Sequence, residues 1–318
     1  MVAQFRVGCV PYVNARPLVA AFDQPNEFVE VIYDIPSKLP ALLDSGEVDA
    51  ILVSSIELLR RDDLLPVAEV GIMSYGPVRS VRMLSKVPMK EIKTLALDQS
   101  SLTSNILAQI ILAEQGVFPK TETLSPDASD MLANHDACVL IGDKGFEADG
   151  TGLVDIDLGE AWTDMTGLPF VWALWLGKKE RQTEFQTLHS ILYLGYRASG
   201  FDSLHILLDH DRVCKTRTVG ITKPDYLEKL VSSSEREAGR REFVSESAAK
   251  SSGWTIESAQ GYLTNNVRYK SIDSQKGLRA FGQLIDKHNI CKVRMLEPSY
   301  FDLQKQIFAL IPEPGTNE

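Results

Sequence analysis

The strongest constraint on the fold of this chain is a regular alternation of short apolar runs with helical patterns. Residues 5–10 predict a buried strand, 14–22 a helix, and 28–35 a second strand with alternating apolar positions. A leucine-rich helical face follows in 36–49, and 50–55 form another apolar run. Strands that alternate with helices in this way form parallel sheets joined by right-handed crossovers.

The same alternation begins again near residue 94. Residues 94–98 predict a strand, 100–117 a long helix, and 137–143 a buried strand followed by a short helix. Extended apolar segments at 76–88 and 167–179 lie on either side of this second series. Two separate β-α series with an extended segment at each end indicate two α/β lobes joined by two crossings of the chain.

We therefore expect a two-lobed α/β fold of the periplasmic-binding-protein type, second class, with a ligand cleft between the lobes. The chain would enter the second lobe near 86–94 and return near 170–178. The first lobe would comprise 1–88 and 178–318, with a mostly helical part from 180 to 311 packed on it, and the second lobe 89–177. Ligands of open α/β sheets bind outside the carboxyl ends of the strands, which here face the cleft.

Charge and motifs exclude several functions. A net charge of −10 and a pI of about 5.1 argue against nucleic acid or an anionic membrane as partner. No apolar run approaches the roughly 20 residues of a membrane span, and the first residues do not resemble a signal peptide, so a cytoplasmic protein is expected. The four cysteines are far apart, and nucleotide-binding glycine motifs and metal-binding histidine motifs do not occur, so neither a cofactor nor a metal is predicted.

Hydroxyl residues gather where the second series turns from strand into helix. The stretch "LDQSSLTSN" (97–105) contains Ser100, Ser101, Thr103 and Ser104. One hydroxyl is enough to cap a helix. The surplus favours an anion site, in which hydroxyls and free backbone N–H groups at the helix start hold a carboxylate or phosphate.

Two further strand ends carry polar residues that have both a structural and a functional explanation. Ser54 and Ser55 follow the strand at 50–55, where helix capping accounts for them equally well. Gly142 permits a tight turn after the strand at 137–143. Asp143 next to it either caps the short helix or presents a carboxylate to the cleft.

The stretch "PYVNARPL" (11–18) follows the first strand. Asn14 is a suitable N-cap and Pro17 suits the first turn of a helix. Tyr12, Asn14 and Arg16 would also lie at the rim of the cleft, where Arg16 either contacts substrate or forms a salt bridge on the helix surface. Ser80, in the first crossing segment, is expected near the hinge at the floor of the cleft.

Read together, six segments resemble chorismate dehydratases of the futalosine route to menaquinone. The likeness is strong over about residues 4–180, and "TGLPFVWALW" after "LIGD" is its most distinctive part. The segments are "PYVNARPL" (11–18), "LLDSGEVDAILVSSIELL" (42–59), "GPVRSVRMLSKVP" (76–88), "LDQSSLTS" (97–104), "LIGD" (140–143) and "DLGEAWTDMTGLPFVWALW" (157–175).

The resemblance implies a lyase that removes water from chorismate to give 3-[(1-carboxyvinyl)oxy]benzoate, without a cofactor. It implies that Asn14 orients the substrate; the base is either Asp143 or the enolpyruvyl carboxylate of the substrate itself. Substrate-binding candidates are Tyr12, Ser54, Ser55, Ser80, Ser101, Thr103, Ser104 and Gly142. The family often has Arg where this chain has Leu102, which removes a charge contact only if that side chain faces the substrate. The alternative is a non-catalytic binding protein or sensor for a small carboxylate.

Overall fold

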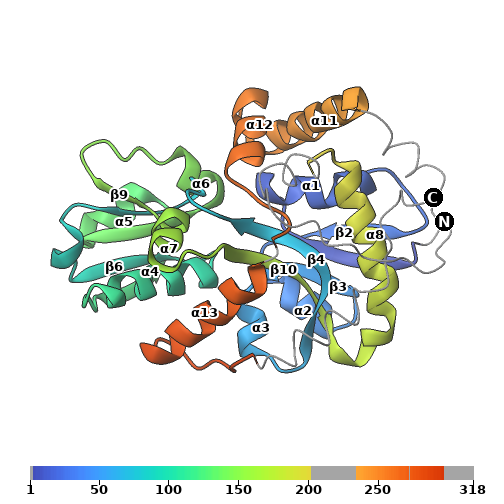
Figure 1. The fold of residues 1–318 in the computed structure, drawn as a ribbon. Coiled ribbons are helices and arrows are strands. Elements are labelled where there is room, and N and C mark those ends of the chain that lie inside the picture. Colours follow the sequence, from blue (N-terminus) through green and yellow to red (C-terminus); the bar gives the residue numbers. More distant parts are fainter. Residues whose placement is uncertain (1–2, 202–233, 272, 297–318) are drawn as a thin grey trace.

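The computed structural model describes residues 3–201, 234–271 and 273–296, and these form two α/β lobes side by side (Figure 1). Each lobe is built on a five-stranded sheet, with strand orders β2-β1-β3-β10-β4 and β7-β6-β8-β5-β9. The first sheet consists of β1 (Phe5–Cys9), β2 (Val29–Tyr33), β3 (Ala50–Ser54), β4 (Leu64–Ser74) and β10 (Phe170–Lys178). The second consists of β5 (Val81–Ser85), β6 (Thr94–Asp98), β7 (Lys120–Leu124), β8 (Ala137–Ile141) and β9 (Val154–Asp157).

The predicted parallel strands are confirmed in both sheets. β1 pairs in parallel with β2 and β3, and β6 pairs in parallel with β7 and β8. Their central strands β3 and β8 are apolar and buried along almost their whole length, as strands with both faces covered must be. The carboxyl ends of both parallel sets face the junction between the lobes, so the polar residues that follow these strands meet there.

The expected lobe boundaries are wrong for two strands. β5 lies within 1–88 but pairs antiparallel with β8 and β9 of the second sheet. β10 lies almost wholly within 89–177 but pairs antiparallel with β3 and β4 of the first. The apolar character of an extended segment does not indicate by itself which of the two sheets the segment joins. We propose instead that the chain crosses at 75–80 and at 167–169, the segments that separate β4 from β5 and α7 from β10.

Short helices connect the strands of the first lobe. The predicted helix at 14–22 is broken into η1 (Val13–Ala15), α1 (Arg16–Val19) and η2 (Ala20–Phe22), and α2 (Leu39–Asp44) and α3 (Ile56–Arg60) follow. The second lobe contains η3 (Met89–Glu91), α4 (Leu102–Glu114), α5 (Ala128–Asn134), α6 (Gly142–Glu147) and α7 (Leu158–Thr166). β4, β7 and β9 had no predicted counterpart.

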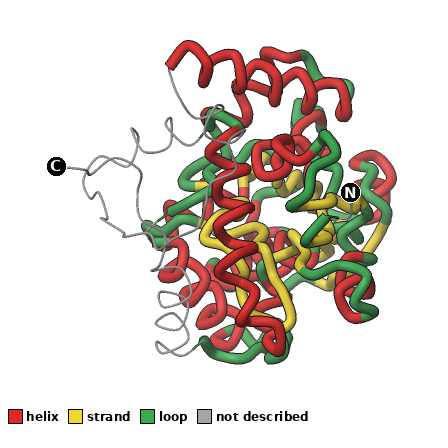
Figure 2. The backbone as a smooth tube through the Cα atoms, turned by 90° about the vertical axis from the view of Figure 1, so that its right-hand side faces the viewer, coloured by secondary structure: helices red, strands yellow, loops and turns green. Residues whose placement is uncertain are grey.

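The part after the second crossing is helical, as predicted. It consists of η4 (Lys179–Glu184), α8 (Phe185–Ala198), α11 (Ser234–Ser252), α12 (Ile256–Asn265) and α13 (Ser274–Lys287); predicted helical segments within 202–233 and 297–311 lie outside the described residues. α8 lies along the first sheet against β4, as Figure 2 shows from the side.

Two of these helices do not simply cover the first lobe. α12 and α13 lie on opposite sides of the junction between the lobes (Figure 1). α13 packs against β10 of the first sheet and α4 of the second lobe, and Lys287 at its end donates to Glu114 of α4 at 2.7 Å. The C-terminal part therefore takes part in joining the lobes.

Candidate functional site

A cavity of about 670 Å³, its open mouth included, lies at the junction of the two lobes. Its walls are mostly apolar, and its polar side chains come from the ends of strands in both sheets. It is lined by Val10, Tyr12, Asn14, Pro36, Leu52, Val53, Ser54, Ile72, Val78, Ser80, Val81, Ser100, Ser101, Ser104, Ile141, Gly142, Trp172 and Ala173. Such a space suits a small ring with a few polar substituents.

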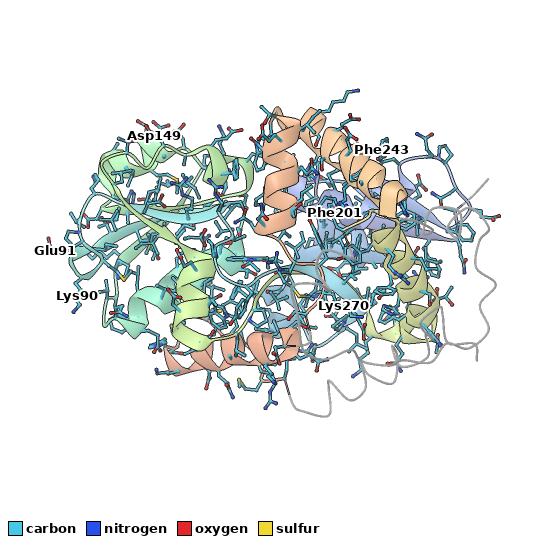
Figure 3. The ribbon with its side chains drawn as sticks, turned by 45° about the horizontal axis from the view of Figure 1, so that its top comes forward. Lys90, Glu91, Asp149, Phe201, Phe243 and Lys270 are labelled. Carbon is cyan, nitrogen blue, oxygen red and sulfur yellow. The ribbon has the colours of Figure 1, made fainter. Side chains whose placement is uncertain are left out.

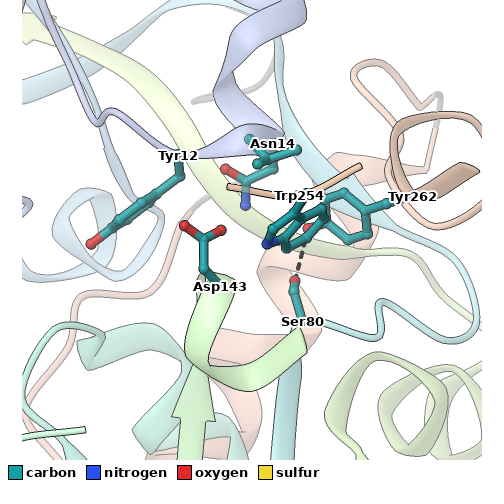
Figure 4. A pocket seen from close by; sticks show the side chains of 8 residues that line it. Tyr12, Asn14, Ser80, Asp143, Trp254 and Tyr262 are labelled. Carbon is teal, nitrogen blue, oxygen red and sulfur yellow. Dashed lines mark hydrogen bonds between the residues drawn. The ribbon is translucent and has the colours of Figure 1, made fainter. Parts of the chain in front are cut away.

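A smaller side pocket opens from the same place and shares Tyr12, Asn14, Ser80 and Gly142 with the cavity. Val13, Asp143, Trp254 and Tyr262 complete its wall. Figure 4 shows the Asn14 amide, the Asp143 carboxylate and the Trp254 indole turned toward one another. The site therefore consists of a largely apolar cavity with a polar side pocket.

Asn14 is held by its backbone, while its amide oxygen is left available. The expectation that Asn14 caps a helix is wrong: Asn14 lies inside η1, whose N-cap position is Tyr12. The Tyr269 hydroxyl donates to the Asn14 carbonyl at 2.9 Å. The Asn14 amide oxygen is buried and has no hydrogen-bond partner among the described residues. A buried polar atom without a partner costs stability, which is a reason to expect a ligand there.

Ser80 and Tyr262 link the hinge to α12. Ser80 is the last residue of the first crossing, directly before β5, and lines the cavity; its hydroxyl bonds to that of Tyr262 at 2.8 Å. Burial raises the pKa of Tyr262 to about 12, although hydrogen bonds with Ser80 and Asn14 oppose this rise. Tyr262 therefore stays neutral and holds the hinge serine beside Asn14.

Asp143 lies in the first turn of α6, after Gly142 with a φ of 58°. It does not cap that helix, because the N-cap position is Ile141 and no side chain caps it. Burial raises the pKa of Asp143, and the nearby charge of Glu147 adds to the rise. A half-buried carboxyl that keeps its proton at higher pH than usual is suited to proton transfer.

The start of α4 is capped as expected, but its hydroxyls are partly used by the protein. Ser101 accepts from the backbone N–H of Ser104 at 3.3 Å, and its hydroxyl donates to that of Ser104 at 2.8 Å. Fully buried Asp98 accepts from the Ser100 N–H at 2.8 Å and from the Ile141 N–H at 3.2 Å. This carboxylate next to the helix start weakens the attraction of the site for a second anion.

Ser55 and Thr103 do not line either pocket. Ser55 is fully buried and donates to the Val171 carbonyl at 2.6 Å. Thr103 bonds to the Ser54 hydroxyl and accepts from the Ile56 N–H at 3.2 Å. Since Ser54 follows β3 and Thr103 belongs to α4, this pair joins the two lobes across the cleft.

Two residues of uncertain role are now placed. Arg16 is 8% exposed and bonds to Tyr33 at 2.8 Å, to Ser247 at 2.8 Å and to Asp23, so it joins α1 to α11 and does not line the cavity. The sequence left open whether Arg16 forms a surface salt bridge or contacts substrate. The structure shows instead that Arg16 is buried and paired with Asp23. Leu102 is 40% exposed and lines neither pocket.

Lys, Arg and His side chains do not occur among the described residues that line the two pockets. Charged side chains such as Lys90, Glu91 and Asp149 lie at the outer edge of the second lobe, away from the junction (Figure 3). Any carboxylate bound in the cavity would therefore depend on hydroxyls and backbone N–H groups. Within the same described ranges, His, Cys, Asp and Glu do not gather into a group that could hold a metal ion.

Sequence reasoning missed Trp254, Tyr262 and Trp172 as pocket residues. Trp172 lines the cavity, and its indole donates to Ser74 at 3.0 Å. Trp254 and Tyr262 come from a segment whose helical pattern suggested only packing on the first lobe. No local signal could have placed them, because they are far from Asn14 along the sequence and only the tertiary fold brings them close to it.

None of the helices in the described ranges is long and apolar enough to cross a membrane.

Comparisons of the chain with other proteins agree with this architecture. The structure is similar to the periplasmic aliphatic sulphonate binding protein of Escherichia coli, with a TM-score of 0.59, 15% identity, and coverage of 95% of this chain and all of that one (100%). A Candida albicans protein described as having the generic periplasmic binding protein fold gives a TM-score of 0.53 at 11% identity, with 100% of both chains covered. At these identities the likeness concerns the fold alone, and it confirms the predicted fold class.

Sequence comparisons are more specific. Residues 5–199 match the family model described as menaquinone biosynthesis, which is more than half of the 318 residues. A chorismate dehydratase of Thermus thermophilus is 31% identical over 195 residues, covering 54% of this chain and 71% of the relative. One of Campylobacter jejuni is 30% identical over 176 residues, covering 52% and 64%. The fold, the junction cavity and these matches together show that the chain belongs to the menaquinone biosynthesis family, and within it to the group of the chorismate dehydratases.

Proposed function

We propose that this protein dehydrates chorismate to 3-[(1-carboxyvinyl)oxy]benzoate, as a step of the futalosine route to menaquinone. The observation that carries the proposal is that Asn14 and Ser80, which line a ring-sized cavity, meet Asp143 in its side pocket, in a chain of this family. The reaction would take place in the cytoplasm, as expected from the sequence.

The dehydration of chorismate requires few functional groups from the protein. Chorismate carries a hydroxyl at C4 and a hydrogen at C3, and their loss as water makes the ring aromatic. The protein has to fix one ring conformation, accept the C3 proton and protonate the departing hydroxide. Fixed geometry supplies much of the acceleration of such a step, and a cleft that excludes water strengthens each polar contact.

The arrangement of the site supports a division of roles. The apolar walls of the cavity would hold the ring, and Ser54, Ser101 and Ser104 would hold a carboxylate at its polar end. The Asn14 amide would orient the substrate, since an amide has no useful pKa. This leaves Asp143 as the proton-transferring side chain.

Asp143 has two possible roles, and both begin from its raised pKa. As base it would take the C3 proton, and turnover would be lost as the pH falls through that pKa. As acid it would protonate the leaving hydroxide, and turnover would be lost as the pH rises through it. In the second case the enolpyruvyl carboxylate of the substrate takes the C3 proton. We favour the acid role, because a raised pKa widens the pH range over which the carboxyl keeps the proton that the leaving group needs.

The test is to incubate the purified protein with chorismate and to follow both compounds by chromatography with mass detection. Conversion to the enolpyruvyl benzoate supports the proposal. Binding of chorismate without conversion would instead identify a binding protein or sensor for a small carboxylate, the alternative that the fold alone allows. Absence of both binding and conversion would contradict both functions.

A further inference from the structure

The side pocket contains donors and acceptors that the protein itself does not use. The Trp254 indole nitrogen and the Asn14 amide oxygen are both buried, and neither has a hydrogen-bond partner among the described residues. Both line the side pocket together with Asp143 (Figure 4). Two unused groups of opposite kind in one small space indicate a ligand group that both accepts and donates a hydrogen bond.

The chemistry of the pocket selects the kind of group. A hydroxyl accepts from the Trp254 N–H and donates to the Asn14 oxygen. A carboxylate only accepts, so it would be repelled by the Asn14 oxygen and would leave that oxygen without a donor. The empty space of the pocket, its open mouth included, is about 160 Å³, which does not admit a whole ring. A hydroxyl of the ligand is therefore the better occupant.

Trp254 is also one of the points at which the C-terminal part contacts the second lobe. Its ring stacks on Phe146 of α6 with 3.9 Å between centroids and 23° between planes, and Tyr262 contacts Phe146 edge-on at 5.6 Å. Phe146 follows Asp143 by one turn of the same helix. The stack thus holds the Trp254 indole in the wall of the side pocket that Asp143 also lines.

From these contacts we propose that Trp254 is a specificity-determining residue, whose indole N–H binds the hydroxyl that the substrate loses. This inference rests on the proposed function, and it assigns a role to a residue outside the segment 5–199 that matches the family. The Asn14 oxygen accepts from the same hydroxyl. When the C4–O bond breaks, the bonding pair leaves with oxygen and Asp143 gives that oxygen a proton, so that water forms. The enolpyruvyl carboxylate takes the C3 proton, and the electron pair of the C3–H bond forms the new ring double bond.

The product offers a control, because it lacks this hydroxyl. W254F keeps an aromatic ring on Phe146 and removes only the N–H. We expect kcat/KM for chorismate to fall about three- to tenfold, the range that one neutral hydrogen bond gives. The inhibition constant of the product should change by less than about twofold, since the product makes no such bond.

Two further variants separate the hydrogen bond from packing. F146A removes the ring stacked on Trp254 and should weaken the binding of chorismate and of product to the same extent. W162F removes the indole N–H of another buried tryptophan, which likewise has no hydrogen-bond partner within the described ranges but packs against Phe170 and Phe281 outside both pockets. W162F should leave both constants unchanged. The Trp254 indole ¹⁵N–¹H signal of the unmodified protein, identified by its loss in W254F, should shift more with excess chorismate than with product.

Each outcome decides the matter. If W254F weakens the binding of chorismate and of product equally, or changes neither, Trp254 does not bind the hydroxyl. The same conclusion follows if the indole signal responds equally to both compounds. If the protein turns chorismate over and W254F behaves as the unmodified protein does, this inference fails while the proposed function stands. If chorismate neither binds nor reacts, both fail.

Discussion

Asn14 is a residue whose side chain contributes little to the fold and is available to a ligand. Its amide oxygen has no partner among the described residues, although its side chain bonds to Tyr262 and its backbone carbonyl accepts from Tyr269. We expect Asn14→Ala to lower kcat at least about tenfold, because the orienting amide is lost. The free energy of unfolding should fall by no more than about 1 kcal/mol, since the one hydrogen bond removed within the protein is that with Tyr262. Turnover and urea unfolding measure the two effects.

Asn26 provides the matched control. Its amide donates to the carbonyls of Gln24 and Val29 and accepts from the N–H groups of Phe28 and Val29, far from the cleft. Asn26→Ala should therefore lower stability by about 1–3 kcal/mol and leave kcat unchanged. If Asn14→Ala lost stability in the same way and kept its kcat, Asn14 would be a structural residue only.

Asp143 combines a cost in stability with a role in proton transfer. Its pKa is raised mainly by burial, so the folded state binds this proton more tightly than the unfolded state does. The resulting stabilisation is complete below the unfolded pKa and is lost as the pH rises through the folded pKa. We expect Asp143→Asn to be more stable than the unmodified protein above that pKa, and to have a kcat lower by about 100-fold or more. Thermal unfolding and kcat measured across pH test this.

The direction of the pH profile decides between the two roles of Asp143. As the acid, it should give the unmodified protein a kcat that falls as the pH rises, and Asp143→Asn should lack this dependence. A kcat that instead falls toward low pH would assign Asp143 as the base. Near-normal turnover in Asp143→Asn would exclude it from proton transfer altogether.

Among the elements, α6 is the one whose position matters most for the site, because it carries both Asp143 and Phe146. Gly145 lets it approach the hinge: a Cβ there would lie 2.3 Å from the Ser80 carbonyl oxygen and 2.8 Å from that of Leu140. Gly145→Ala must displace α6 or the backbone of the hinge. We expect a loss of about 1–3 kcal/mol in stability, and a lower kcat because Asp143 moves with the helix. Urea unfolding and turnover are the measurements.

A glycine in α12 serves as the control for this substitution. A Cβ on Gly261 would have no atom within 4 Å, so Gly261→Ala should stabilise the protein by about 0.5–1 kcal/mol through helix propensity. Its kcat should stay the same. Equal stability changes in the two variants would show that the close approach at Gly145 does not position α6.

At the scale of the molecule, the two lobes are joined across the cleft by side chains on several sides. Thr103 of α4 bonds to Ser54 and to the backbone of Ile56. Thr103→Val keeps the shape and removes these bonds, so we expect a more open ligand-free molecule, with a larger radius of gyration by X-ray scattering. KM for chorismate should rise with kcat nearly unchanged, because closure then costs binding energy.

Thr94 provides a threonine inside one lobe for comparison. Its hydroxyl donates to the Asp136 carboxylate at 3.0 Å and accepts from the Asp136 N–H at 2.9 Å. Thr94→Val should reduce stability without changing the radius of gyration. If Thr103→Val raised KM with no change in that radius, Thr103 would contact the substrate directly, as the sequence led us to expect.

The alternation of strands and helices was sufficient to predict two α/β lobes and their parallel strands. The spacing of apolar residues within a segment indicates whether that segment forms a strand or a helix, and this spacing is visible in the sequence. It did not place β5 and β10 correctly. Both strands are largely buried and could pair with either sheet, and only long-range hydrogen bonding selects the partner. β7 was missed because four of its five residues are exposed, so it lacks an apolar run.

For the site, the sequence by itself determined which polar residues follow the strands, and therefore that Asn14, Ser80 and Asp143 lie near the cleft. The tertiary structure decided how they are used. Ser55 and Thr103 have the same hydroxyl chemistry as their neighbours, yet they bond within the protein, because the fold turns them away from the cavity. Trp254 and Tyr262 enter the site only because α12 packs across the junction of the lobes. A contact between residues so far apart in the chain depends on how whole elements pack, which no local pattern of residues records.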